Sequence, residues 1–245
     1  MSIAWPYPRW IAHRGAGKLA PENTLAAFRL GAGFGYRAFE CDVKLSRDGV
    51  PFLLHDATLE RTTSGQGSAA DRTLAELQRL DAGSWLGPAW AGEPPPTLEA
   101  IARYVIANGF VLDLEIKPTP GLEGETGKVV AREAQRLWAG RAVPPLLSSF
   151  QPASLAAARD AAPALPRALL LDELHAGWFD AALALGCVGV VTDRRLMDGA
   201  VAARLHAAGL RALCYTVNDA AEAERLLAAG VDGIVTDAVD RFAPG

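Results

Sequence analysis

The chain has 245 residues, half of them hydrophobic, so it can bury one substantial core, and α/β barrels of this length commonly form a single domain. Its 24 basic and 28 acidic residues give a net charge of −4 without any lysine-rich or arginine-rich run, which argues against nucleic acid as a partner. We find neither a signal-peptide pattern nor an uncharged run long enough to span a bilayer. We therefore expect a cytoplasmic protein without a stable membrane anchor, and the sequence carries no signal for an oligomeric state.

The cysteines give no sign of a disulfide framework or of a zinc site. Cys41, Cys187 and Cys214 lie far apart in the sequence and form no C-x-x-C pair. Free cysteines are often buried as small apolar side chains. We expect these three in the core.

Short apolar runs typical of strands alternate along the chain with alanine-rich and leucine-rich runs of helical spacing. The expected strands are 9–13, 37–43, 110–116, 144–150, 167–172, 189–193, 211–217 and 232–237. The expected helices are 23–35, 97–109, 127–140, 152–163, 175–186, 198–209 and 220–230. Eight βα units in this length predict an α/β fold of the (β/α)8 TIM-barrel type, as one domain over residues 1–245. A doubly wound sheet is the weaker alternative, because no G-x-G-x-x-G follows the first strand.

The interval from Ala57 to Pro96 breaks this alternation. It is rich in Thr, Ser, Gly, Asp and Pro, and only residues 73–80 have helical spacing. We expect a small insertion after the second strand that caps the C-terminal mouth of the barrel. Just before it, the Arg47–Gly49 sequence RDG predicts a hairpin turn, and the returning strand is expected to end in His55 and Asp56.

Charged side chains gather where the predicted strands end, which is where TIM barrels carry their functional groups. These side chains are His13, Arg14, Glu40, Asp42, Glu115 and Lys117. The three carboxylates offer hard oxygen ligands suited to Mg²⁺ or Ca²⁺, with positions left for water and a phosphate oxygen. The alternative is a set of structural ion pairs, in which Arg37 or Lys44 pairs with Glu40 and Asp42, and Lys117 pairs with Glu115. Buried ion pairs seldom accumulate for stability alone, which favours the site.

Two of the four histidines stand at the presumed mouth. His13 and His55 each terminate an apolar strand, and a pair of groups with near-neutral pKa suits a general base and a general acid in cleaving a P–O bond. His175 and His206 lie in predicted helical stretches. We expect those two to be structural or exposed.

Seven motifs in order along the chain closely resemble the glycerophosphodiester phosphodiesterase family. They are HRG at 13–15, PENT at 21–24, ECDVKLSRDGVPFLLHD at 40–56, LEIKP at 114–118, SSF at 148–150, YTVN at 215–218 and GVDGIVTD at 230–237. The segment GKLAPENTLAA at 17–27 is most similar to cytosolic bacterial members associated with glycerol-3-phosphate uptake.

The resemblance implies a TIM barrel with a small insertion after the second strand, which hydrolyses a small-molecule glycerophosphodiester to sn-glycerol 3-phosphate and an alcohol. It implies that the catalytic residues are His13 and His55, that Arg14 and Lys117 hold the phosphate, and that Glu40, Asp42 and Glu115 bind one divalent cation. Pocket or supporting residues from its motifs are Glu22, Phe150, Tyr215 and Asn218. Many relatives have Trp where this chain has Tyr215, and Tyr still supplies a flat face. Glu22 is either a supporting partner of the site or only a favourable charge at a helix start.

Two rival functions remain to be separated. An aldolase would use Lys117 as a Schiff-base nucleophile, with borohydride trapping and no need for metal. A phosphodiester-binding protein without activity would be expected to lack His13 or His55, and both are present. The residues favour the hydrolase, although the alcohol, the choice between Mg²⁺ and Ca²⁺, and the acid and base roles stay open.

Overall fold

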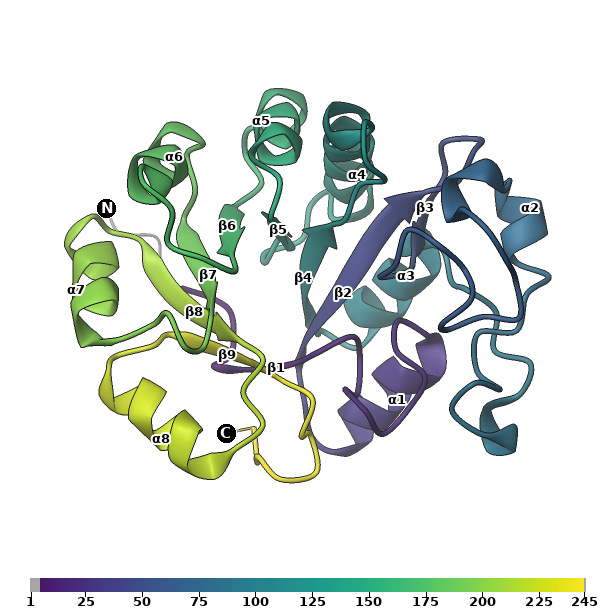
Figure 1. The fold of residues 1–245 in the computed structure, drawn as a ribbon, viewed down its shortest axis with the longest axis horizontal. Coiled ribbons are helices and arrows are strands. Elements are labelled where there is room, and N and C mark those ends of the chain that lie inside the picture. The colour runs from purple at the N-terminus through teal and green to yellow at the C-terminus, as the bar shows by residue number, and fades with distance from the viewer. Residues whose placement is uncertain (1–4, 245) are drawn as a thin grey trace.

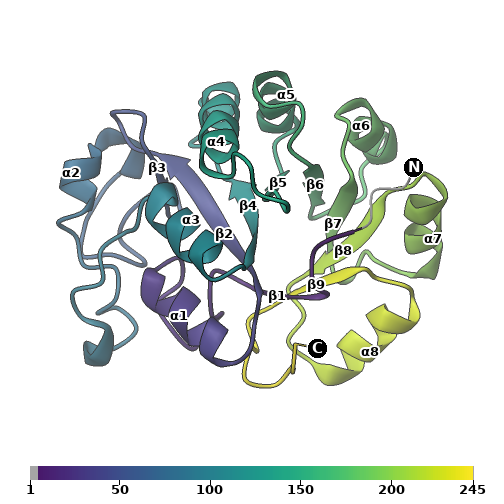
Figure 2. The same cartoon turned by 180° about the vertical axis from the view of Figure 1, so that it is seen from behind.

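The computed structural model describes residues 5–244. Eight parallel strands form a ring, closed because β1 pairs with both β2 and β9 (Figure 1). An additional strand, β3 (Pro51–Leu53), runs antiparallel to β2. Figure 2 shows from behind that helices surround the ring. The predicted TIM barrel is confirmed, and the doubly wound alternative is wrong.

All eight barrel strands overlap the expected ones. They are β1 (Trp10–Ala12), β2 (Ala38–Leu45), β4 (Val111–Ile116), β5 (Leu146–Ser149), β6 (Arg167–Leu171), β7 (Gly189–Asp193), β8 (Arg211–Tyr215) and β9 (Gly233–Thr236). Parallel strands under a layer of helices are buried on both faces, and every residue of β2 is buried. Continuous apolar runs therefore predicted these strands well.

Helices follow the strands in the expected order. They are α1 (Leu25–Gly33), α3 (Leu98–Ala107), α4 (Glu123–Leu137), α5 (Pro152–Ala161), α6 (Trp178–Ala184), α7 (Gly199–Ala207) and α8 (Ala220–Ala228). Side chains of Thr24, Thr97, Asp198 and Asp219 cap four of these by accepting first-turn N–H groups. Within residues 5–244, no helix has the length and apolar character needed to cross a bilayer. The cytoplasmic location stays a prediction.

Two helices begin three or more residues away from the expected position. Helix α4 begins four residues before the expected Gly127, and it packs so closely on α5 that a Cβ at Gly127 would lie 2.2 Å from the Ser154 carbonyl oxygen. His175 precedes α6 instead of lying within it, because the helix starts only after Gly177 in the left-handed conformation. His175 and His206 are both exposed, as expected.

Apolar side chains fill both the ring and the space outside it. One cluster is built from strand residues and Tyr7, and its aliphatic members are Ile11, Ala38, Leu146, Ala168, Leu170, Val191, Leu213 and Val235. Two larger clusters fill the space between strands and helices, and all three cysteines lie in them. The expectation of buried cysteines is confirmed.

The segment 57–96 lies beside the barrel mouth, not over it. It holds α2 (Leu74–Leu77) and two short 3-10 turns, Ala69–Asp71 and Pro88–Trp90, and it sits next to β3, α1 and α3 in both views (Figures 1 and 2). The expected cap is wrong because the segment has an apolar cluster of its own, built on Phe52 and Leu54, which draws it to the outer edge of β3.

Candidate active site

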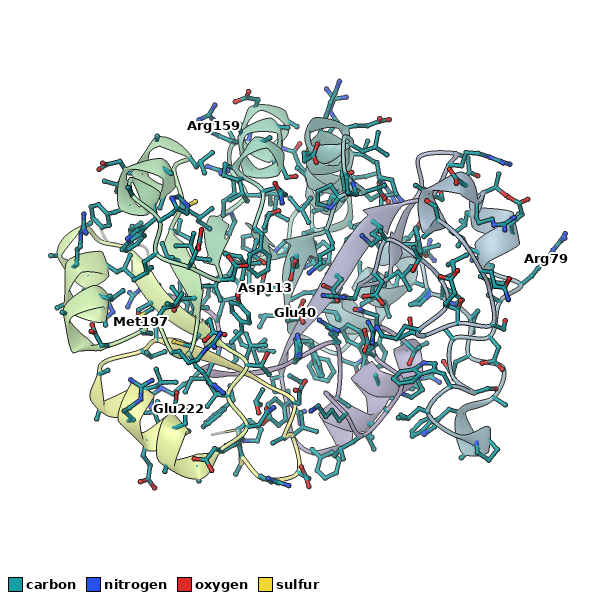
Figure 3. All side chains as sticks on the ribbon, in the orientation of Figure 1. Glu40, Arg79, Asp113, Arg159, Met197 and Glu222 are labelled. Carbon is teal, nitrogen blue, oxygen red and sulfur yellow. The ribbon has the colours of Figure 1, made fainter. Side chains whose placement is uncertain are left out.

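A cavity of about 170 Å³ opens at the carboxyl ends of the barrel strands. Eight of the residues singled out in the sequence line it: His13, Arg14, Glu40, His55, Glu115, Lys117, Phe150 and Tyr215. Asp42 and Glu22 lie behind this lining and contact Lys117 and Arg14, which belong to it. Asn218 lies one step further back, because it contacts Asp237, which in turn contacts His13. Figure 3 places Glu40 and Asp113 near the centre of the ring, on β2 and β4.

Three buried carboxylates converge in this cavity. The parallel register of β2 and β4 sets Asp42 beside Glu115, and Glu40 shares the face of Asp42 because it lies two residues away. One oxygen of each carboxylate lies within 4.8 Å of the others. Glu40 Oε1 and Asp42 Oδ1 are buried without a hydrogen-bond partner in the described protein, and Glu115 Oε1 has the Lys117 ammonium 2.8 Å away. Hard oxygen donors in this state fit a divalent cation, so these residues could bind a metal ion.

Burial and mutual repulsion raise the pKa of two of these carboxyl groups. The pKa of Glu40 is raised by loss of water and by the charges of Asp42 and Glu115, and that of Glu115 rises to about 7 for the same kind of reason. Burial also acts on Asp42, but the charges of Arg14 and Lys117 outweigh it and hold its pKa well below the usual range. The cluster therefore resists carrying three negative charges unless a positive charge compensates them.

The ion-pair alternative accounts for only part of this cluster. Lys117 Nζ lies 2.8 Å from Glu115 and 3.7 Å from Asp42. Arg37 donates instead to the carbonyls of Ala32 and Tyr36, and Lys44 donates to the carbonyl of Lys117. Arg37 and Lys44 therefore do not form the expected pairs, and Glu40 keeps a buried oxygen unpartnered.

His13 is held by a carboxylate from the far end of the chain. Its Nδ1 lies 2.7 Å from Asp237 Oδ1, so the carboxylate accepts the Nδ1 proton and Nε2 faces the cavity. Asn218 fixes Asp237 in turn: its amide donates to Asp237 Oδ2, and its Oδ1 accepts the Asp237 N–H. A cavity-facing Nε2 with an oriented ring is the arrangement that proton transfer requires.

His55 has the same kind of support. The strand β3 ends at Leu53, so His55 lies two residues past its end instead of on it, and its Nδ1 lies 2.7 Å from Asp56 Oδ1. Burial lowers the pKa of His55 below 6.5, although the Asp42 charge works against that change. The hydrogen bond to Asp56 acts in the same direction as the Asp42 charge, so it favours the protonated imidazole that a general acid needs.

A charged network of the insertion connects the surroundings of His55 and Arg14. The Arg61 guanidinium donates to both oxygens of Asp56 and to both oxygens of Glu22. Glu22 Oε1 also accepts from Arg14 at 2.8 Å, and Arg14 forms an ion pair with Asp42 at 3.1 Å. Glu22 thus acts as a partner of two guanidinium groups. These contacts favour a role for Glu22 as a supporting partner of the site over a role as a favourable charge at a helix start.

We expect Arg61→Met to lower kcat by about 10- to 100-fold, because Asp56 and Glu22 lose the group that fixes their positions. Removal of this positive charge also strengthens the effect of Asp56 on His55, so the pKa of His55 should rise and its limb of the pH profile should move upward. The profile of kcat against pH measures both effects. Arg79→Met is the matched control, since Arg79 belongs to the same insertion and points away from the barrel (Figure 3). An unshifted profile would leave Arg61 a purely structural residue.

The loop after β1 explains the glycines and the PENT motif. Gly17 has φ +57, and a Cβ there would lie 2.2 Å from the backbone of Asp237, so only glycine lets the loop pack against the residue that holds His13. Asn23 also has positive φ, and its side chain binds both the carboxylate and the N–H of Asp42. PENT therefore supports a predicted metal ligand in addition to starting α1.

Five functional neighbours were not identified from the sequence: Asn23, Asp56, Arg61, Asp113 and Asp237. Asp56 and Asp237 had a usable signal, since each is a carboxylate at the end of an apolar strand run. Asp113 lies two residues before Glu115 on β4 and lines the cavity, where burial raises its pKa to about 7 and Ser148 donates to it. Arg61 had no signal, because 39 residues separate it from Glu22.

A TIM barrel whose mouth joins a buried carboxylate triad to two oriented histidines has the features of a hydrolytic enzyme with acid–base groups. The family model described as "Glycerophosphoryl diester phosphodiesterase family" matches residues 13–241. The chain belongs to this family, and it is a glycerophosphodiester phosphodiesterase.

Similar proteins span almost the whole chain. The glycerophosphodiester phosphodiesterase of Caldanaerobacter subterraneus subsp. tengcongensis is 34% identical over 238 residues, which covers 93% of each chain. That of Bacillus subtilis (strain 168) is 31% identical over 249 residues, covering 95% of this chain and 84% of the relative. A phosphodiesterase of Oleispira antarctica, solved with the product sn-glycerol-3-phosphate, superposes with a TM-score of 0.89 at 35% identity and covers 96% of this chain and 95% of that one.

Proposed function

We propose that this chain hydrolyses glycerophosphodiesters to sn-glycerol 3-phosphate and an alcohol, with one divalent cation, Mg²⁺ or Ca²⁺. The observation that carries the proposal is that three buried carboxylates and two aspartate-supported histidines meet in one cavity. The product bound to the Oleispira antarctica relative supports it. We also propose one catalytic domain over residues 1–245, with 57–96 as an insertion.

The proposed roles follow from what each side chain can donate or accept. Glu40, Asp42 and Glu115 would hold the cation, which when bound supplies positive charge to the phosphoryl oxygens. Arg14 and Lys117 would bind the phosphate, and one histidine would take a proton from the attacking hydroxyl while the other gives one to the departing oxygen. The attacking hydroxyl belongs either to the substrate's own glycerol, which would form a cyclic phosphate, or to water.

The aldolase alternative is disfavoured by the surroundings of Lys117. Burial lowers the pKa of this ammonium, but the carboxylates of Glu115 and Asp42 outweigh that effect and raise it. A Schiff-base nucleophile needs the opposite shift, toward a neutral amine.

EDTA treatment tests the proposal directly. We expect EDTA to abolish release of glycerol 3-phosphate from glycerophosphocholine, and added Mg²⁺ or Ca²⁺ to restore it. In the same preparation, borohydride with a carbonyl substrate should leave the protein mass unchanged. Full activity in EDTA, or a covalent adduct on Lys117, would contradict the proposal.

We expect deacylated, water-soluble diesters to be cleaved at least tenfold faster than intact phospholipids. The two cavities at the mouth measure about 170 and 380 Å³, and charged side chains such as Glu115 and Lys117 project into both, so they are small and poorly suited to two acyl chains. Turnover of glycerophosphocholine and of micellar diacyl phosphatidylcholine, compared at equal concentration, measures this ratio. Comparable turnover would show that another surface receives the acyl chains.

A further inference from the structure

A second cavity of about 380 Å³ adjoins the central one at the barrel mouth. The two share four lining residues, His55, Glu115, Lys117 and Phe150. Small-molecule sites usually measure about 300–1,000 Å³, so the central cavity alone is small for a whole diester. The second cavity supplies the missing space directly beside His55.

The two histidines relate differently to this second cavity. His55 lines both cavities, whereas His13 lines only the central one. In an asymmetric diester, the phosphate and one alcohol would occupy the central cavity next to both histidines. The other alcohol would then extend past His55, which places that histidine beside the departing oxygen.

Lys44 is the unusual group of the second cavity. It is 2% exposed, at the mouth end of β2, and its ammonium donates to the carbonyl of Lys117 at 3.0 Å. Within residues 5–244 it forms no ion pair with a carboxylate. Buried charges normally have a charged or fully hydrogen-bonded partner, and an ammonium has three N–H donors, of which this contact uses one.

The nearby carboxylates are engaged elsewhere. Asp42 and Glu115 pair with Lys117, and Asp56 binds His55 and Arg61. Glu123 also lines the cavity and accepts the N–H of Gly121. Lys44 is therefore the buried cation of this cavity with donors left for a ligand.

We propose that the cavity beside His55 is the subsite for the leaving alcohol, and that Lys44 selects alcohols carrying hydroxyl or carboxylate oxygens over quaternary ammonium alcohols. This inference rests on the proposed function. A hydroxyl or carboxylate accepts a hydrogen bond from the ammonium, while a trimethylammonium group offers no acceptor and is repelled by its charge.

The test compares diesters that differ only in the alcohol. We expect Lys44→Met to lower the ratio of kcat/KM for glycerophosphoglycerol to that for glycerophosphocholine by about tenfold or more, the size of one lost hydrogen bond to a charged group. Lys128→Met makes the same substitution at an exposed position of α4 and should keep the wild-type ratio. An unchanged ratio in folded Lys44→Met would overturn the inference.

A second variant tests the cavity without altering a buried charge. Gln151 is exposed, lines the second cavity and precedes α5, so Gln151→Trp should fold and narrow the cavity. We expect it to lower kcat/KM for glycerophosphoinositol at least tenfold relative to the methyl ester of glycerol 3-phosphate. Equal effects on both esters would also overturn the inference. Wild-type protein that cleaves no diester with Mg²⁺ or Ca²⁺ would instead refute the proposed function itself.

Discussion

His13→Ala and His55→Ala are each expected to lower turnover of glycerophosphodiesters by about 10²–10⁴, the usual loss on removal of a general acid or base. Both imidazoles are oriented by an aspartate at 2.7 Å with Nδ1 engaged, so each has one nitrogen available for proton transfer. His175→Ala is the matched control, because His175 is exposed and lies outside both cavities. Wild-type turnover should show a bell-shaped pH profile.

A substrate with a much better leaving group separates the two roles. A nitrophenyl ester of glycerol 3-phosphate needs little help from an acid, so it should largely rescue the variant that lacks the acid and fail to rescue the one that lacks the base. We expect rescue of His55→Ala, because His55 also lines the cavity proposed for the leaving alcohol. Rescue of neither variant, or equal rescue of both, would contradict the division into one acid and one base.

Glu40→Gln, Asp42→Asn and Glu115→Gln are each expected to weaken metal affinity and activity together, by about 100-fold or more. Each change removes one charged oxygen from the triad. A cation at 100 times its Kd stabilises the wild type by about 2.7 kcal/mol, and a 100-fold weaker site leaves about 0.4 kcal/mol. Thermal melts with and without metal, together with metal titrations of activity, measure these losses.

The effect of Glu40→Gln on thermal stability without metal can also be predicted. A carboxyl group whose pKa is raised on folding destabilises the protein as pH rises above its unfolded value. Glutamine removes that cost, so metal-free Glu40→Gln should melt no lower than the wild type at pH 7 while losing the response to metal. Glu224→Gln, on the exposed side of α8, should retain the full response. Wild-type activity at wild-type metal concentration would remove Glu40 from the proposed ligands.

The sequence predicted the barrel because its local patterns and its packing agree. Apolar runs buried on both faces identified the strands, and the i, i+2 spacing correctly placed Glu40 and Asp42 on one face of β2. Neither pattern predicts which side chains from distant segments contact one another at the barrel mouth. The contacts of Arg61 with Glu22 and of Asp237 with His13 join distant segments and depend on the closed ring.

The position of the insertion, residues 57–96, was predicted wrongly. Its polar composition suggested a cover for the mouth, but composition does not tell in which direction a segment packs. Phe52 and Leu54 of the preceding hairpin, with Leu59, Ala69 and Leu77, form a cluster at the outer edge of β3. Their burial fixes the segment there, and Ala57 is the one residue of 57–96 that lines either cavity.

The contact between His13 and Asp237 joins residues 224 positions apart, and β1 also bonds β9 through the His13 N–H and the Thr236 carbonyl. A contact between residues so far apart forms only after a long loop has closed, and that closure costs conformational entropy. During synthesis, the ribosome must therefore release Asp237 before His13 acquires its partner. A nascent chain can form most of its strands and still lack the oriented imidazole, so hydrolysis begins only when β9 has joined β1.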